Sequence, residues 1–298
     1  MTKVIVALAA LLLLVACTSS GGGDTASPGT GPATTSSLSP AATGTTGEPA
    51  VREISVAVDG RTIAGQCEGE PSAGAPTVVL DSGMGNDRTQ LRAIGDALLE
   101  RTMVCSYDRA GYGASDPPAS LPRPITDVVE DLHAFLSEGD VPAPYFLIGH
   151  SQGGGNVLLF SVEHPDEVAG FVAMNPGAPC SLYLRTVAEV MSRDELQAEV
   201  ENCEGQNPEG IDLRSQSAVL RTSLPPSMPY AVMYAFNCAG DDFCERVRPV
   251  ELRDEAVLAD LGEGGRFVEV KGADHEIWLT DMDIVLQTID DVWADATD

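Results

Sequence analysis

Lysine is nearly absent from this chain of 298 residues, where Lys3 and Lys271 are its only copies. Lysine and arginine together number 17 against 45 aspartates and glutamates, so the formal net charge is −28 at pH 7. A surface this negative repels the phosphates of DNA and RNA. The composition therefore argues against nucleic acid as a partner.

Zinc-type ligand spacing is also missing. The chain contains no Cys-x-x-Cys pair, and its four histidines are scattered along the sequence. Structural zinc sites usually take closely spaced cysteines and histidines. The sequence therefore predicts no metal site, and nothing in it indicates a cofactor.

No apolar run is long enough to span a bilayer. The longest, at the N-terminus, covers Val4 to Ala16 after a basic start at Lys3. As a helix it would reach about 20 Å, short of the ~30 Å hydrocarbon core, so residues 1–17 are predicted to be a signal peptide. Its end, Leu14-Val15-Ala16-Cys17, resembles a bacterial lipobox, which implies acylation of Cys17. A plain secretory signal with a chance cysteine is the alternative, and either one exports the protein.

Residues 18–50 contain no aromatic side chain and consist almost wholly of Thr, Ser, Gly, Ala and Pro. Such a segment cannot bury enough apolar surface to offset the entropy of ordering it. We predict a disordered stalk over 18–50 and one folded domain over 51–298. The expected location is extracytoplasmic, with a monomer anchored to the outer face of the cell membrane only by the lipid on Cys17.

The domain alternates short apolar runs with amphipathic stretches, which is typical of a mostly parallel sheet flanked by helices. Asp59-Gly60 joins the first two runs and signals a hairpin. Between 177 and 229 the alternation stops and a polar, helical segment predicts a lid insertion. The predicted strands are 53–58, 61–67, 77–81, 103–107, 145–149, 170–174, 230–236 and 266–271. The predicted helices outside the lid are 88–100, 125–138, 152–163, 250–261 and 281–294.

The most informative motif is Gly149-His150-Ser151-Gln152-Gly153, which stands between a buried strand pattern and a helical pattern. Gly-x-Ser-x-Gly in this setting indicates a nucleophile elbow, a sharp turn that lifts the serine clear of the sheet. The glycines at 149 and 153 fit because the strand and helix approach each other closely there. Ser151 is the candidate nucleophile.

This order of elements, with the elbow on the fifth strand, resembles the α/β-hydrolase fold from about Glu53 to the C-terminus. The segment Cys105 to Asp116, which contains Asp108-Arg109-Ala110-Gly111, is similar to a loop motif of that superfamily. The resemblance implies an eight-stranded, mostly parallel sheet with a helical lid insertion. It also implies the chain order serine, acid, histidine for a catalytic triad.

Among the four histidines only His275 follows both the elbow and the lid region, so it is the candidate base. The acid of this fold usually follows the strand before the last, where Asp242 is our choice and Asp241 the alternative. Some relatives carry an aspartate after the strand that follows the elbow, but this chain has Asn175 there.

A developing oxyanion needs two backbone N–H donors. By the resemblance these are Gln152, which follows the nucleophile, and Met84, in the Gly-rich turn Asp81-Ser82-Gly83-Met84-Gly85. Export also favours disulfides among the six cysteines of the domain. Their places in the predicted elements pair Cys67 with Cys105, Cys180 with Cys203, and Cys238 with Cys244.

These residues predict a serine hydrolase that cleaves a small acyl substrate, an ester, thioester or small amide, through an acyl-enzyme. A peptidase on the same fold is one alternative. A cell-surface binding protein that keeps the scaffold without activity is another.

Overall fold

The structure is a computed structural model that describes residues 50–298. The predicted signal peptide, the acylation site at Cys17 and the stalk up to residue 49 lie outside the described residues. Within residues 50–298, no helix combines the length and apolar character required to cross a membrane.

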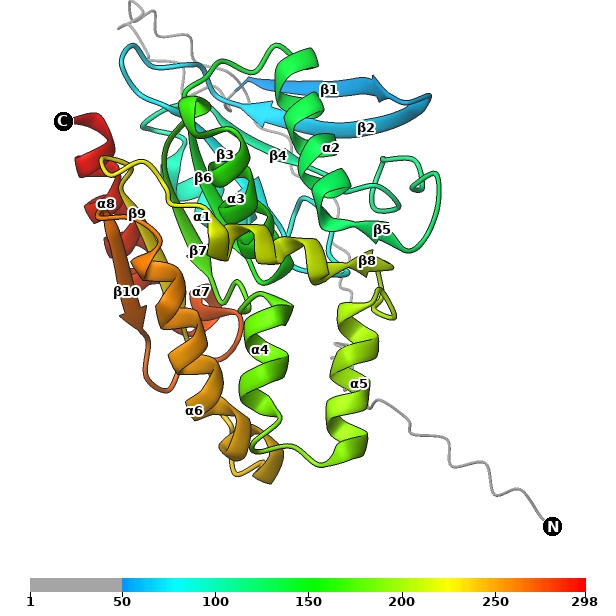
Figure 1. The fold of residues 1–298 in the computed structure, drawn as a ribbon. Helices are drawn as coiled ribbons and strands as arrows, with labels where there is room; N and C mark the ends of the chain where they lie inside the picture. Colours follow the sequence, from blue (N-terminus) through cyan, green and yellow to red (C-terminus); the bar gives the residue numbers. More distant parts are fainter. Residues whose placement is uncertain (1–49) are drawn as a thin grey trace, which may run out of the picture. The chain divides into compact units, whose positions relative to one another are not determined.

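The main sheet has eight strands in the order β1-β2-β4-β3-β6-β7-β9-β10 (Figure 1). β2 runs antiparallel to both of its neighbours, and the other neighbouring pairs are parallel. The predicted mostly parallel, eight-stranded sheet is confirmed, and β6 lies between β3 and β7. The strands are β1 Val51–Val58, β2 Arg61–Glu68, β3 Thr77–Asp81, β4 Val104–Tyr107, β6 Tyr145–His150, β7 Val168–Met174, β9 Tyr230–Tyr234 and β10 Gly265–Glu269.

Helices cover both faces of this sheet, so the parallel strands are buried on both sides and read as continuous apolar runs. Alternate residues of β3 show the division: Val79 packs in one core with α2 and α3, whereas Val78 and Leu80 pack in a second core with α1 and α8. The helices are α1 Arg92–Leu98, α2 Ile125–Glu138, α3 Gln152–Glu163, α7 Ile277–Thr280 and α8 Met282–Thr297.

The insertion between β7 and β9 contains two helices, α4 Cys180–Val187 and α5 Arg193–Cys203, and a 3-10 helix over Leu213–Arg221. It also contains one strand that we did not predict, β8 Ile211–Asp212, which pairs in parallel with β5 Arg123–Pro124 outside the main sheet. Figure 1 shows α4 and α5 beyond the carboxyl ends of the parallel strands. The insertion therefore lies where a lid would cover the site.

The helix predicted at 250–261 begins earlier, and our prediction of its start was wrong. In the structure α6 spans Asp242–Ala256 because the Asp241 side chain accepts the Cys244 N–H at 2.8 Å and caps the helix. Val247 and Val250 of α6 share a small core with Val187 of α4. As a result α6 extends the lid, although it follows the insertion in sequence.

Three disulfides join the cysteine pairs named above. Cys67 and Cys105 are direct partners in the register of β2 and β4. The bridge between Cys180 and Cys203 connects α4 to α5 within the insertion, and the Cys238–Cys244 bridge connects the loop after β9 to the first turn of α6. Two of the three thus hold parts of the lid.

Candidate active site

Ser151 lies on a strained turn between β6 and α3. Its backbone angles are φ 53° and ψ −118°, a conformation that few L-residues adopt. A Cβ on Gly149 would lie 2.2 Å from the Gly153 carbonyl oxygen, and one on Gly153 would lie 2.1 Å from the Asp81 carbonyl oxygen. Gly149 is therefore required by the close crossing of β6 and α3, and Gly153 by the close approach of α3 to the end of β3, as in a nucleophile elbow.

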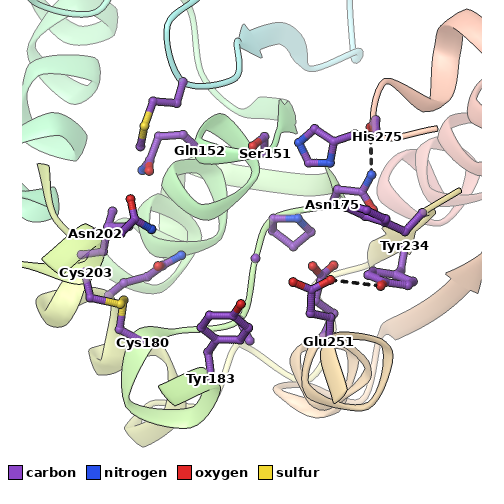
Figure 2. A pocket seen from close by; sticks show the side chains of 18 residues that line it. Ser151, Gln152, Asn175, Cys180, Tyr183, Asn202, Cys203, Tyr234, Glu251 and His275 are labelled. Carbon is purple, nitrogen blue, oxygen red and sulfur yellow. Dashed lines mark hydrogen bonds between the residues drawn. A yellow bond between two sulfur atoms is a disulfide. The ribbon is translucent and has the colours of Figure 1, made fainter. Parts of the chain in front are cut away.

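A cavity of about 320 Å³ opens beside this turn. Ser151, His275, Met84 and Gln152 all line it, so the structure brings these four predicted residues to one place. Figure 2 shows Ser151 and His275 on the same side of the cavity, with Glu251 and Tyr183 across from them. The arrangement puts a serine hydroxyl and an imidazole on one ligand-sized space.

His275 lies in the loop that leads from β10 to α7, and two side chains hold its backbone. Its carbonyl oxygen accepts hydrogen bonds from Asn175 Nδ2 at 2.8 Å and from His150 Nε2 at 3.1 Å. Burial lowers the pKa of the His275 imidazole, and the charge of Glu276 partly offsets this. The ring is therefore neutral at pH 7 and able to accept a proton.

His150, the variable residue of the elbow motif, is 1% exposed and packs edge-on against Trp278 with ring centroids 4.7 Å apart. Burial, followed by the nearby charge of His275, lowers the pKa of His150 to about 3. Because a carbonyl oxygen only accepts, His150 Nε2 carries the proton in its bond to His275. His150 thus supports the His275 loop as a neutral side chain.

The structure does not bring either acid candidate to His275. Asp241 uses its side chain to cap α6, and Asp242 is exposed in the first turn of that helix. Neither one lines the cavity. Among residues 50–298, the buried Nδ1 atom of His275 has no hydrogen-bond partner at all. The loop that we expected to present a carboxylate is instead the start of a lid helix.

The candidate oxyanion loop follows β3. The Gly83 N–H donates to Gln90 Oε1 at 2.6 Å and the Gly85 N–H donates to Glu209 Oε1 at 2.8 Å. Between them, the Met84 N–H has no acceptor in the described part of the chain. The Gln152 N–H belongs to the first turn of α3, where backbone donors have no partner within the helix. Both predicted donors are therefore available to a ligand.

Arg109 fixes the shape of this loop. The residue belongs to the motif Asp108-Arg109-Ala110-Gly111, but the motif alone did not reveal this role. Its guanidinium donates to the carbonyl oxygens of Ser82 and Gly83 and forms ion pairs with Asp81 at 2.7 Å and Glu209 at 2.6 Å. All the charged groups are buried. The opposing charges outweigh the burial penalty and raise the pKa of Arg109, so it stays protonated.

The histidines that are scattered in sequence form two pairs in space. His150 lies 4.7 Å from His275 between ring centroids, and His133 stacks on His164 at 4.0 Å. Glu167 Oε1 lies 3.1 Å from His133 Nε2, so three ligand-type side chains meet where α2 faces the end of α3 and the turn that follows it. Scatter along the chain was thus a poor reason for excluding a metal site.

Comparison with known proteins places residues 76–199 in a family model described as the alpha/beta hydrolase fold. A putative carbamate hydrolase from Caulobacter segnis is 31% identical over 120 residues, which cover 38% of this chain and 44% of that protein. The chain therefore matches less than half the length of this relative.

Two solved structures are similar over most of the described domain. One is a thermophilic esterase from Thermogutta terrifontis, with a TM-score of 0.56 and 18% identity over 84% of this chain and 100% of that chain. The other is an enol-lactonase from Burkholderia xenovorans, with a TM-score of 0.57 and 20% identity over 80% of this chain and 99% of that chain. Together with the family model, these likenesses show that the chain has the α/β-hydrolase fold.

Proposed function

We propose that this protein is a serine hydrolase that cleaves an ester, thioester or small amide through an acyl-enzyme. The observation that carries the proposal is the strained elbow, which turns Ser151 toward a cavity that it shares with the neutral imidazole of His275. A serine that shares a cavity with a neutral base suits nucleophilic catalysis, in which the base activates the hydroxyl. The similar proteins are a putative carbamate hydrolase, an esterase and an enol-lactonase, and these names also favour hydrolysis.

In this proposal His275 accepts the hydroxyl proton of Ser151 while the serine Oγ forms a bond to the substrate carbonyl carbon. The carbonyl oxygen becomes an oxyanion that accepts hydrogen bonds from the N–H groups of Met84 and Gln152. The C–O, C–S or C–N bond to the leaving group then breaks as His275 returns the proton to that group. Water attacks the acyl-enzyme by the same steps and releases the acid and free Ser151.

This scheme contains no triad acid, because no carboxylate among residues 50–298 accepts a hydrogen bond from the His275 imidazole. Two groups instead hold the His275 backbone, namely Asn175 and His150. They orient the loop that carries the base, which is one part of what an acid contributes. The other part, stabilisation of the charged imidazolium, comes in this scheme from the charge of Glu276, which raises the pKa of His275.

A fluorophosphonate probe tests the proposal, because it forms a covalent bond only with an activated serine. We expect the full-length protein to become labelled, Ser151→Ala to abolish labelling, and Ser72→Ala to leave it intact as the control for an exposed serine. An intact protein that resists the probe, and that hydrolyses no p-nitrophenyl ester, would favour a binding protein on the same scaffold.

We also propose that the protein works outside the cytoplasm, anchored by a lipid on Cys17. Three disulfides in the described domain suit an oxidising compartment. Metabolic labelling with an alkyne fatty acid should mark the wild type and miss Cys17→Ala. Equal labelling of both proteins would contradict the anchor.

A further inference from the structure

Two carboxylic acids line the cavity beside Ser151. Glu251 and Glu255 both line it, and none of its lining residues is a lysine or an arginine. These two glutamates stand four residues apart on α6, so they face the same side of the helix. Nothing in the sequence distinguishes these two glutamates, because acidic residues are common throughout this chain.

Glu255 is the more unusual of the two. It is 5% exposed, it lines the cavity, and its Oε2 atom has no hydrogen-bond partner among residues 50–298. Native proteins rarely leave a buried carboxyl oxygen unpaired, because the group loses its hydration and gains nothing in return. An unpaired carboxyl oxygen on a residue that lines a cavity points to a ligand that supplies the missing partner.

Glu251 lies one helical turn before Glu255. Its Oε2 accepts the Tyr234 hydroxyl at 3.3 Å, and its side chain points into the pocket across from Ser151 (Figure 2). Two acidic side chains at this helical spacing repel each other when both are charged. A cation between them would convert that repulsion into two attractions.

Within residues 50–298, the neighbouring charges that act on the pair are negative. Glu199 of α5 and Asp254 of α6 contribute further negative charge near Glu251. On the same helix, Arg248 directs its guanidinium to Glu269 at 3.6 Å and Arg253 pairs with Asp254 at 3.4 Å. The other titratable groups that line the cavity are Tyr183, Tyr234 and His275.

We propose that Glu251 and Glu255 form a subsite for a positively charged group of the substrate, an ammonium or a guanidinium. The inference rests on the proposed serine hydrolase and names its substrate class, acyl compounds that carry a cation within reach of the cavity. A primary ammonium has three donors, enough for the free oxygen of Glu255 and for an oxygen of Glu251.

Protonation follows from this geometry. Burial, together with the neighbouring Glu251, raises the pKa of Glu255 well above its usual range, and burial also raises the pKa of Glu251. In the empty pocket these carboxyls hold protons more firmly than exposed glutamates do. A cation that enters stabilises their charged forms, so its binding releases a proton to solvent. Binding of a permanent cation should therefore tighten as the pH rises.

Matched esters test the subsite through turnover. The probes are p-nitrophenyl ω-guanidinoalkanoates of graded chain length, and the controls replace the guanidinium by the uncharged urea group. At the best chain length we expect kcat/KM for the cationic ester to exceed that for the neutral ester by about tenfold or more. Glu255→Gln and Glu251→Gln should each bring this ratio toward one, whereas the exposed Glu245→Gln on the same helix should keep it.

Binding to Ser151→Ala tests the subsite without turnover. In calorimetry on the full-length variant, n-butylammonium should bind about tenfold or more tightly than 1-butanol, with proton release that Glu255→Gln removes. No hydrolysis of any ester, with preferential ammonium binding, would overturn the proposed function and retain the subsite. Hydrolysis without charge preference, together with equal binding of the two ligands, would overturn the subsite alone.

Discussion

Asn175 Nδ2 donates a hydrogen bond to the backbone carbonyl oxygen of His275 at 2.8 Å, so a side chain at the end of β7 holds the loop that carries the candidate base. The same amide accepts the Ala235 N–H through Oδ1 at 2.7 Å, which ties it to the end of β9. Asn175 is 4% exposed and has a positive φ of 46°. It thus connects three strand ends at the point where relatives of this fold can carry an acid.

Replacing Asn175 by Ala should lower kcat about tenfold or more, because the loop that carries His275 loses the hydrogen bond that holds it. Two buried partners also lose their hydrogen bonds, so the free energy of unfolding should fall by about 1–3 kcal/mol. Ester kinetics and urea unfolding measure the two effects. Wild-type kcat in Asn175→Ala would contradict the role of the donor.

The pH profile should report on His275. A base acts in its neutral form, and burial lowers the pKa of His275 below its usual 6.5. The acid limb of kcat/KM should therefore have its midpoint below pH 6.5, with full activity above it. Glu276 is the charge that raises this pKa, so Glu276→Gln should move the midpoint further down. A midpoint above 6.5 would show that a carboxylate reaches the imidazole in the working enzyme.

Asp241→Asn and Asp242→Asn should both keep wild-type kcat, because both residues stand at the start of α6 and neither lines the cavity. Asparagine also caps helices well, so the first variant should keep its stability, whereas Asp241→Ala should lose about 1 kcal/mol. Ester kinetics and urea unfolding distinguish these effects. Loss of kcat by orders of magnitude in one asparagine variant alone would identify that residue as the triad acid.

Ser151 should carry a cost in stability. Its φ of 53° and ψ of −118° suit glycine better than any residue with a Cβ. Ser151→Gly should therefore unfold at higher urea than Ser151→Ala, by about 1 kcal/mol in free energy, since both lack the hydroxyl and only one relieves the backbone. Equal stabilities would mean that the turn carries no strain.

Glu209 should be essential to the oxyanion loop. Its carboxylate pairs with the buried guanidinium of Arg109 and accepts the Gly85 N–H. Glu209→Gln leaves a buried charge partly unpaired, so the free energy of unfolding should fall by about 3 kcal/mol and kcat should fall with it. Glu204→Gln, an exposed glutamate in the same insertion, is the control. Unchanged kcat in Glu209→Gln would show that catalysis does not depend on the ion pair between Arg109 and Glu209.

The sequence predicts elements well where the signal is local. Strand β3 and helices α2 and α3 begin and end where the pattern places them, because each has apolar periodicity with clear limits. The start of α6 was missed because an aspartate such as Asp241 occurs both in loops and as the N-cap of a helix. Which of the two it becomes depends on the packing of α6 against α4, which the sequence does not show. Local patterns identify an element's type more reliably than its ends.

Within the site, the elbow was visible in sequence because five adjacent residues define it. The pairing of Arg109 with Glu209 was not, since the two stand 100 residues apart and meet only through the fold. The same holds for Asn175 and His275. The glutamates of α6 had a helical spacing that could be read, but 45 acidic residues gave no reason to single out two.

The ion pair between Arg109 and Glu209 also limits how this protein can be redesigned. Glu209 belongs to the insertion, yet it holds a loop of the sheet domain. An engineer who grafts a foreign insertion onto this scaffold, in search of a new substrate range, would remove the only carboxylate that the insertion directs to Arg109 within residues 50–298. Such chimeras should lose turnover even with substrates that fit, unless the donor segment brings an acid to the same position.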